Sequence, residues 1–184
     1  MASSSLGKDG YFNKLEVDKL NVNKLKVNKL NSCSCCDNII NNQEELKNAK
    51  AIALTCIDFR IIDDTVCQMN KLGYLNDYDQ FILAGSSLGY NNILSGSEHW
   101  IKVANQHIDI AINLHDIEQI ILIDHFDCGA YKIAYGSDRY KQNSLKFHTD
   151  NLNKAEKKLN TLYPNLSIKK FLISADGVNF TQIN

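Results

Sequence analysis

Two short apolar segments that each end in reactive side chains constrain this 184-residue chain most strongly. Residues 120–130 read IILIDHFDCGA, so a mostly apolar run leads into His125 and then Cys128. An apolar run of that length, bounded by a glycine, predicts a buried β-strand. Ligands bind beyond the carboxyl ends of the strands in open α/β sheets, and a histidine three residues before a cysteine is a plausible metal-ligand spacing.

The second segment, residues 51–60, reads AIALTCIDFR and predicts another buried strand that ends in Cys56. Residues two apart in an extended segment point to the same side, so Cys56, Asp58 and Arg60 can share one face. On that face Asp58 can pair with Arg60. With the histidine and cysteine of the first segment, Cys56 completes a set of three nitrogen or sulfur ligands. Three such ligands with a free fourth position are the catalytic form of a zinc site.

The predicted ligands of Zn²⁺ are therefore Cys56, His125 and Cys128, and their motifs C-x-D-x-R and H-x-x-C-G resemble those of the β-class carbonic anhydrases. The likeness spans roughly residues 49–177. Ala84-Gly85 stands where that family has a strand-end Ala-Gly, and Ile82-Leu83 replaces the Arg-Asn pair that usually precedes it. The resemblance implies an α/β fold with a mostly parallel sheet flanked by helices. It also implies reversible hydration of carbon dioxide to bicarbonate.

The resemblance further implies roles for individual residues. Asp58 and Arg60 are the expected catalytic pair. While Arg60 holds the Asp58 carboxylate, the carboxylate orients the nucleophile. When Arg60 releases it, the carboxylate could bind the metal as a fourth ligand. Gly85, Ser86 and Gly129 are expected at the substrate pocket. In this family the pocket lies across a dimer interface, so a homodimer or higher homo-oligomer is expected. Two thiolate ligands make zinc a weaker acid than three histidines do, so activity should rise towards alkaline pH.

Two other functions fit the same motifs. One is a zinc hydrolase of the same fold that acts on a small carbon–sulfur substrate. The other is a non-catalytic protein, with a virus particle as the assembly it would belong to, in which zinc only stabilises the fold. Asp58 and Arg60 argue against a purely structural site, which does not need them, whereas Ile82-Leu83 and the N-terminal extension favour it. A phosphatase loop is excluded because it needs a longer stretch between its cysteine and arginine.

The N-terminal extension contains a repeat of five residues, KLEVDKLNVNKLKVNKL, at residues 14–30. Neither a helix nor a flat strand buries apolar residues with this period on one face. We expect a segment for oligomerisation or anchoring, which resembles the intertwined stalks of viral fibre proteins; a solvated arm is the alternative. Cys33, Cys35 and Cys36 follow and could cross-link copies, hold a metal or have no role. The expected organisation is an arm with its cysteine-rich junction at 1–37, a linker at 38–43 and a zinc domain at 44–184.

Charge and composition exclude several classes of protein. A formal net charge of −1 implies no general attraction to nucleic acids or membrane surfaces. No apolar run approaches the roughly 18 residues of a membrane span, and the N-terminus lacks the features of a signal peptide. A chain of this size can build a core without disulfides, so its six cysteines fit a reducing compartment. We expect a cytoplasmic location, with virion association as the alternative.

Strands and helices are expected to alternate, which favours a parallel sheet covered on both faces. The strands are expected at 51–56, at 80–84, in the run leading to His125, and at 168–174. Helices are expected at 44–48, 61–72, 97–115, 130–135 and 140–162, with a glycine-bearing turn at 85–89. The other candidate side chains are expected to serve packing, local hydrogen bonding or the surface: Cys67, His99, His107, His115, His148, Asp127 and Tyr131.

Overall fold

The computed structural model describes residues 48–174 and 179–184. Several predictions fall outside these residues: the repeat at 14–30, Cys33, Cys35 and Cys36, the linker at 38–43 and most of the helix expected at 44–48. The boundaries of the arm and the linker therefore stay predictions.

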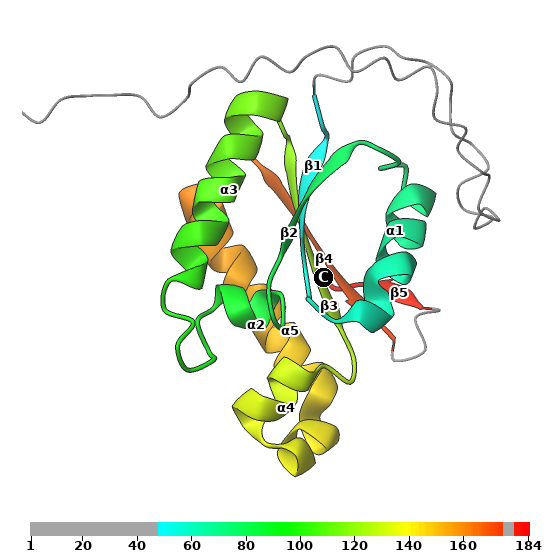
Figure 1. The fold of residues 1–184 in the computed structure, drawn as a ribbon, viewed down its shortest axis with the longest axis vertical. Helices are drawn as coiled ribbons and strands as arrows, with labels where there is room; N and C mark the ends of the chain where they lie inside the picture. Colours follow the sequence, from blue (N-terminus) through cyan, green and yellow to red (C-terminus); the bar gives the residue numbers. More distant parts are fainter. Residues whose placement is uncertain (1–47, 175–178) are drawn as a thin grey trace, which may run out of the picture. The chain divides into compact units, whose positions relative to one another are not determined.

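The described residues fold around a five-stranded sheet in the order β2-β1-β3-β4-β5 (Figure 1). Its strands are β1 (Ala51–Thr55), β2 (Tyr78–Ile82), β3 (Gln119–His125), β4 (Ser167–Ile173) and β5 (Phe180–Gln182). The first four strands are parallel, and β5 pairs antiparallel with β4. The predicted α/β class with a mostly parallel sheet is confirmed.

Helices cover both faces of this sheet, with α1 on one side and α3 and α5 on the other (Figure 1). The helices are α1 (Ile62–Lys71), α2 (Ser87–Tyr90), α3 (Trp100–His115), α4 (Gly129–Tyr135) and α5 (Ser137–Leu162), and a 3₁₀ turn spans Phe59–Ile61. None of the helices in the described part of the chain is long and apolar enough to cross a membrane.

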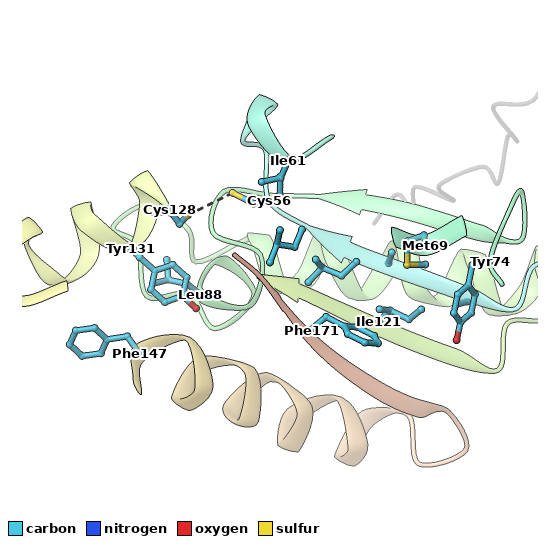
Figure 2. Packing of buried hydrophobic residues seen from close by; sticks show 14 of the residues in the cluster. Cys56, Ile61, Met69, Tyr74, Leu88, Ile121, Cys128, Tyr131, Phe147 and Phe171 are labelled. Atoms are coloured by element: carbon cyan, nitrogen blue, oxygen red, sulfur yellow. Dashed lines mark hydrogen bonds between the residues drawn. The ribbon is translucent and has the colours of Figure 1, made fainter. Parts of the chain in front are cut away.

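The central strand β3 is buried on both faces, which explains its continuous apolar run. Successive side chains of a strand point to opposite faces. Ile121 and Ile123 accordingly pack in the same cluster as Met69 of α1 (Figure 2). Ile120 and Leu122 pack in the second cluster, with α3 and α5. Packing between two layers of helices makes β3 a central strand of the sheet. His125, its last residue, therefore lies at the carboxyl end of the sheet.

Two predicted boundaries are wrong by two or three residues. The strand expected at 80–84 is β2 at 78–82, because its pairing with β1 sets Tyr78 opposite Ala51. An edge strand is only half-buried, so its apolar pattern marks its ends poorly. The helix expected at 97–115 begins at Trp100, whose N–H donates to the Ser97 carbonyl in a preceding turn.

The remaining differences lie in the second half of the chain and next to the expected turn. The helix expected at 140–162 begins at Ser137, directly after Gly136, and Asn143 interrupts it with non-helical dihedral angles. The turn at 85–89 continues into the short helix α2. The strand β5 was not predicted, because it is only three residues long and half-exposed.

Candidate metal centre

The parallel pairing of β1 and β3 brings the two motifs to one edge of the sheet. The pairing runs from Ala51 opposite Gln119 to Leu54 opposite Leu122, so the two strands end side by side. Cys56 follows β1, and His125 is the last residue of β3. Cys128 comes three residues later, directly before α4, and its side chain points towards Cys56 (Figure 2).

The ligand atoms of Cys56, His125 and Cys128 all lie within 4.8 Å of one another, and all three residues are buried. The two Sγ atoms are 3.8 Å apart. Two thiolates bound to one tetrahedral zinc at about 2.3 Å each would be separated by about 3.8 Å. The spacing therefore fits zinc. No other group of three candidate ligands occurs among residues 48–174 and 179–184.

The imidazole of His125 is oriented by the backbone. Its Nδ1 lies 2.9 Å from the Phe126 carbonyl oxygen, which can only accept, so Nδ1 carries the proton. Nε2 is then free to bind through its lone pair. It is buried and has no hydrogen-bond partner within the described residues. An orphaned buried nitrogen is costly unless it has a ligand, and a metal ion would satisfy it.

The two thiols differ in acidity. The hydrogen bond with Cys128 lowers the pKa of Cys56 despite burial, with help from His125 and from the Gly85 N–H, 3.3 Å from Sγ. The pKa of Cys128 is raised by the same hydrogen bond and by burial. Burial lowers the pKa of His125, but the nearby Cys56 and Asp58 outweigh it, so the net pKa is raised. Without metal, the sulfur pair therefore shares one proton, which a metal would displace.

Asp58 and Arg60 form the ion pair that the sequence predicts. Arg60 donates from Nε to Oδ1 at 2.9 Å and from Nη2 to Oδ2 at 2.7 Å, and its backbone N–H also donates to Oδ1 at 3.1 Å. These hydrogen bonds lower the pKa of Asp58 to about 2. Asp58 Oδ2 lies 3.8 Å from His125 Nε2, so the carboxylate is held close to the candidate metal position while bound to Arg60.

Asp127 is a contributor to the site that the sequence did not identify. Arg60 donates from Nη1 to Asp127 Oδ2 at 3.1 Å and from Nη2 to the Asp127 carbonyl at 3.2 Å. Lys132 donates to the other carboxylate oxygen. The hydrogen bonds from Lys132 and then Arg60 lower the pKa of Asp127. The position of Asp127 between His125 and Cys128 was a signal in the sequence for such a contact. The predicted Arg60–Asp58 pair leaves N–H groups of the guanidinium free, and these can bind a second carboxylate.

An open pocket of about 640 Å³ adjoins two of the candidate ligands, Cys56 and Cys128. Its lining residues are Cys56, Ile57, Asp58, Phe59, Arg60, Ala84, Leu94, Asp127, Cys128, Gly129, Ala130, Lys132 and Ile133. Gly129 thus lines the pocket, but Gly85 and Ser86 do not. Gly85 lies behind Cys56 and donates to its sulfur, while the buried Ser86 hydroxyl donates to the Leu54 carbonyl.

The other candidate side chains do not join the group of three candidate ligands. His115 pairs with Asp79 at 2.7 Å, and the His107 ring lies 4.8 Å from that of Phe81. Tyr131 is fully buried and serves packing and local hydrogen bonding, as expected.

His148 is also fully buried, and it contacts Asp124 and Tyr140, two residues that the sequence did not single out.

Comparisons with known proteins agree with this geometry. A family model described as "Putative carbonic anhydrase" matches residues 46–183. An uncharacterized protein of Rickettsia bellii is 39% identical over 135 residues, which cover 72% of this chain and 81% of that protein.

Among solved structures, a carbonic anhydrase of Streptococcus mutans has a TM-score of 0.51 and 15% identity, and covers 76% of this chain and 84% of its own. A β-carbonic anhydrase of Trichomonas vaginalis has a TM-score of 0.51 and 18% identity, and covers 77% of this chain and 87% of its own. At these identities the two structures show the shared fold. The match over residues 46–183 shows more: the chain belongs to this carbonic anhydrase family.

Proposed function

We propose that the protein is a zinc-dependent carbonic anhydrase that catalyses the reversible hydration of carbon dioxide to bicarbonate. One observation carries the proposal: three buried donors with the spacing of a zinc site lie beside the Asp58–Arg60 pair, and two of these donors line the same open pocket as that pair. A structural zinc site is closed by four protein ligands, whereas a catalytic one keeps a position open. The arrangement of the described residues is of the second kind.

Cys56, His125 and Cys128 would hold the zinc. When bound, the ion supplies Lewis acidity that lowers the pKa of a water molecule and so provides a nucleophile. Two thiolates cancel the formal charge of Zn²⁺, which weakens this effect relative to a site with three histidines. The hydration rate should therefore rise towards alkaline pH.

Asp58 and Arg60 would orient the nucleophile. The low pKa of Asp58 keeps it ionised at neutral pH, so its carboxylate can accept a hydrogen bond from the nucleophile in a fixed direction. Arg60 holds both carboxylate oxygens, and Asp127 holds Arg60 in turn. The carboxylate is therefore kept beside His125 Nε2 in one orientation.

The apolar part of the pocket suits carbon dioxide and also suggests an oligomer. Ile57, Phe59, Leu94 and Ile133 offer no hydrogen-bonding side chain to the substrate. Phe59 and Ile133 are 80% and 81% exposed, although both are large and apolar. Exposed apolar side chains grouped at one site mark interaction surfaces. We propose that a second copy of the chain covers this rim and narrows the pocket.

The test is stopped-flow hydration of carbon dioxide by the zinc-loaded protein from mildly acidic to alkaline pH, with Asp58→Ala alongside. We expect a rate that rises with pH and falls at least 100-fold in the variant, since orientation of this kind contributes about 10²–10³-fold. A folded, zinc-loaded protein with no rate above buffer at any pH would refute the proposal. A structural role for the zinc would then replace it.

A further inference from the structure

A buried polar array lies behind the loop that carries the ligands. Asp124 precedes His125 on β3 and is buried. Because neighbouring residues of a strand point to opposite faces, its carboxylate is directed away from the candidate metal position. Asp124 Oδ2 accepts from Tyr131 at 2.6 Å, from Ser87 Oγ at 2.7 Å and from His148 Nδ1 at 3.0 Å.

His148 connects this carboxylate to Tyr140. Both residues belong to α5 and are buried. Nδ1 of His148 donates to Asp124, and its Nε2 shares a hydrogen bond with the Tyr140 hydroxyl, 3.0 Å away. A single chain of hydrogen bonds therefore runs from β3 to the tyrosine. Such buried chains fix geometry, because a group left without its partner is costly.

The far end of the chain reaches the ligand loop. The His148 ring contacts Phe126 edge-to-face, with centroids 5.6 Å apart. Tyr140 belongs to the same buried cluster as Cys128. Burial raises the pKa of the Tyr140 phenol to about 12, although backbone N–H groups of Cys128 and Asp127 interact with its oxygen and lower it.

The loop itself needs outside support. Asp127 has φ of 61°, in the left-handed region that is unfavourable for a residue with a side chain. Within the described residues, its carboxylate pairs with Arg60 and Lys132, and all three side chains are partly exposed. The opposite side of the loop faces His148 and Tyr140.

We propose that Asp124, His148 and Tyr140 are positioning residues that hold the loop between His125 and Cys128 in the conformation that zinc binding requires. The inference rests on the proposed zinc site but not on the hydration of carbon dioxide. Hydrogen-bonding partners outside the ligand set typically change metal affinity by 10- to 100-fold when they are lost.

The experiment compares Tyr140→Phe with Tyr74→Phe as a matched control. Tyr140→Phe removes one hydroxyl from the array and keeps the ring. Tyr74 is equally buried, and its hydroxyl also has polar partners, donating to Gln119 at 2.5 Å and accepting from Lys169 at 2.8 Å. Gln119 is the first residue of β3, at the end far from the ligands.

Three quantities are measured for each variant: zinc affinity by competition with a chelator, the absorption spectrum with Co²⁺ in place of zinc, and urea unfolding of the metal-free protein. We expect Tyr140→Phe to weaken zinc binding about 10- to 100-fold and to shift the Co²⁺ bands. Tyr74→Phe should change affinity less than about twofold at a comparable loss of stability. His148→Phe, which replaces the imidazole with an aromatic ring that carries no nitrogen, should act in the same direction as Tyr140→Phe.

Wild-type affinity and an unchanged Co²⁺ spectrum in folded Tyr140→Phe, or in folded His148→Phe should the first variant not fold, would overturn the inference. An equal loss of affinity in Tyr74→Phe would also overturn it, because the effect would then follow from general stability. A wild-type protein that binds zinc but does not hydrate carbon dioxide would refute the proposed function alone. The affinities would still decide the role of the array.

Discussion

Removal of the Arg60 side chain is the sharpest test of how the site works. Arg60→Ala deletes the two side-chain hydrogen bonds to Asp58, at 2.9 and 2.7 Å, and keeps the backbone one. It also deletes the ion pair with Asp127. Because the Arg60 side chain is 48% exposed, the two ion pairs together should contribute only about 1 kcal/mol to the free energy of unfolding.

The loss of activity should be much larger than this loss of stability. Asp58 would no longer be held in one orientation, and its carboxylate lies only 3.8 Å from His125 Nε2. We expect kcat/KM for carbon dioxide hydration to fall about 100-fold, which corresponds to about 2.7 kcal/mol. The freed carboxylate can approach the metal position, so zinc affinity should rise while the rate falls.

Lys132→Ala is the matched control, because Lys132 pairs with the same Asp127 but does not contact Asp58. Stopped-flow rates, chelator competition and urea unfolding are measured for both variants. Lys132→Ala should stay within about 3-fold of the wild-type rate. Equal rates in Arg60→Ala and Lys132→Ala, or zinc affinity that falls in Arg60→Ala, would contradict the role given to Arg60.

Three further predictions concern packing, metal binding and acid stability. Gly89→Ala places a Cβ 2.5 Å from the Ala84 oxygen, so it should lower the free energy of unfolding by about 3 kcal/mol. The Cβ of Gly129→Ala meets nothing within 4 Å, so this variant should change the free energy of unfolding by less than about 0.5 kcal/mol. Urea unfolding measures both variants, and equal effects would contradict the packing. Apparent zinc affinity should rise about tenfold per pH unit where only Cys128 must lose a proton on binding. Below the raised pKa of His125 a second proton must leave, so the rise should be about 100-fold per pH unit. Chelator competition at a series of pH values measures this slope, and a flat profile would contradict the shared proton. The pKa of Asp58, about 2, lies below the value of about 3.9 in an unfolded chain, so the stabilisation it provides is complete above about pH 4 and disappears as the pH falls towards 2. The difference in unfolding free energy between wild type and Asp58→Asn should shrink over that range, and a constant difference would contradict the ion pair.

The sequence was most informative where burial is complete. β3 is covered on both faces, so its continuous apolar run located the strand and the point at which His125 leaves it. The edge strand β2 and the short strand β5 are half-exposed, and there the apolar pattern gave a shifted boundary or no signal. The predicted starts of two helices were displaced for a different reason: local turns at Ser97 and Gly136 decide where helical hydrogen bonding begins.

The group of candidate metal ligands and the Asp58–Arg60 pair could be predicted from the ends of parallel strands and from local spacing. Asp58 and Arg60 are two residues apart, and parallel strands necessarily end at the same edge of the sheet. The contact between Arg60 and Asp127 was not predicted, because only the path of the loop after β3 shows that the Asp127 carboxylate lies 3.1 Å from the guanidinium. Gly85 and Ser86 were expected at the pocket, but the turn directs them behind Cys56 and onto β1.

The sequence by itself therefore determined which side chains meet at the carboxyl end of the sheet, because strands that alternate with helices run parallel and the motifs lie at strand ends. Only the tertiary structure decided how far apart their atoms lie and what supports them. The 3.8 Å between Cys56 and Cys128 depends on the path of the loop after β3. The link from Asp124 to His148 spans 24 positions and exists because α5 packs against that strand. Contacts of this kind are set by how whole layers pack, and no local sequence pattern encodes them.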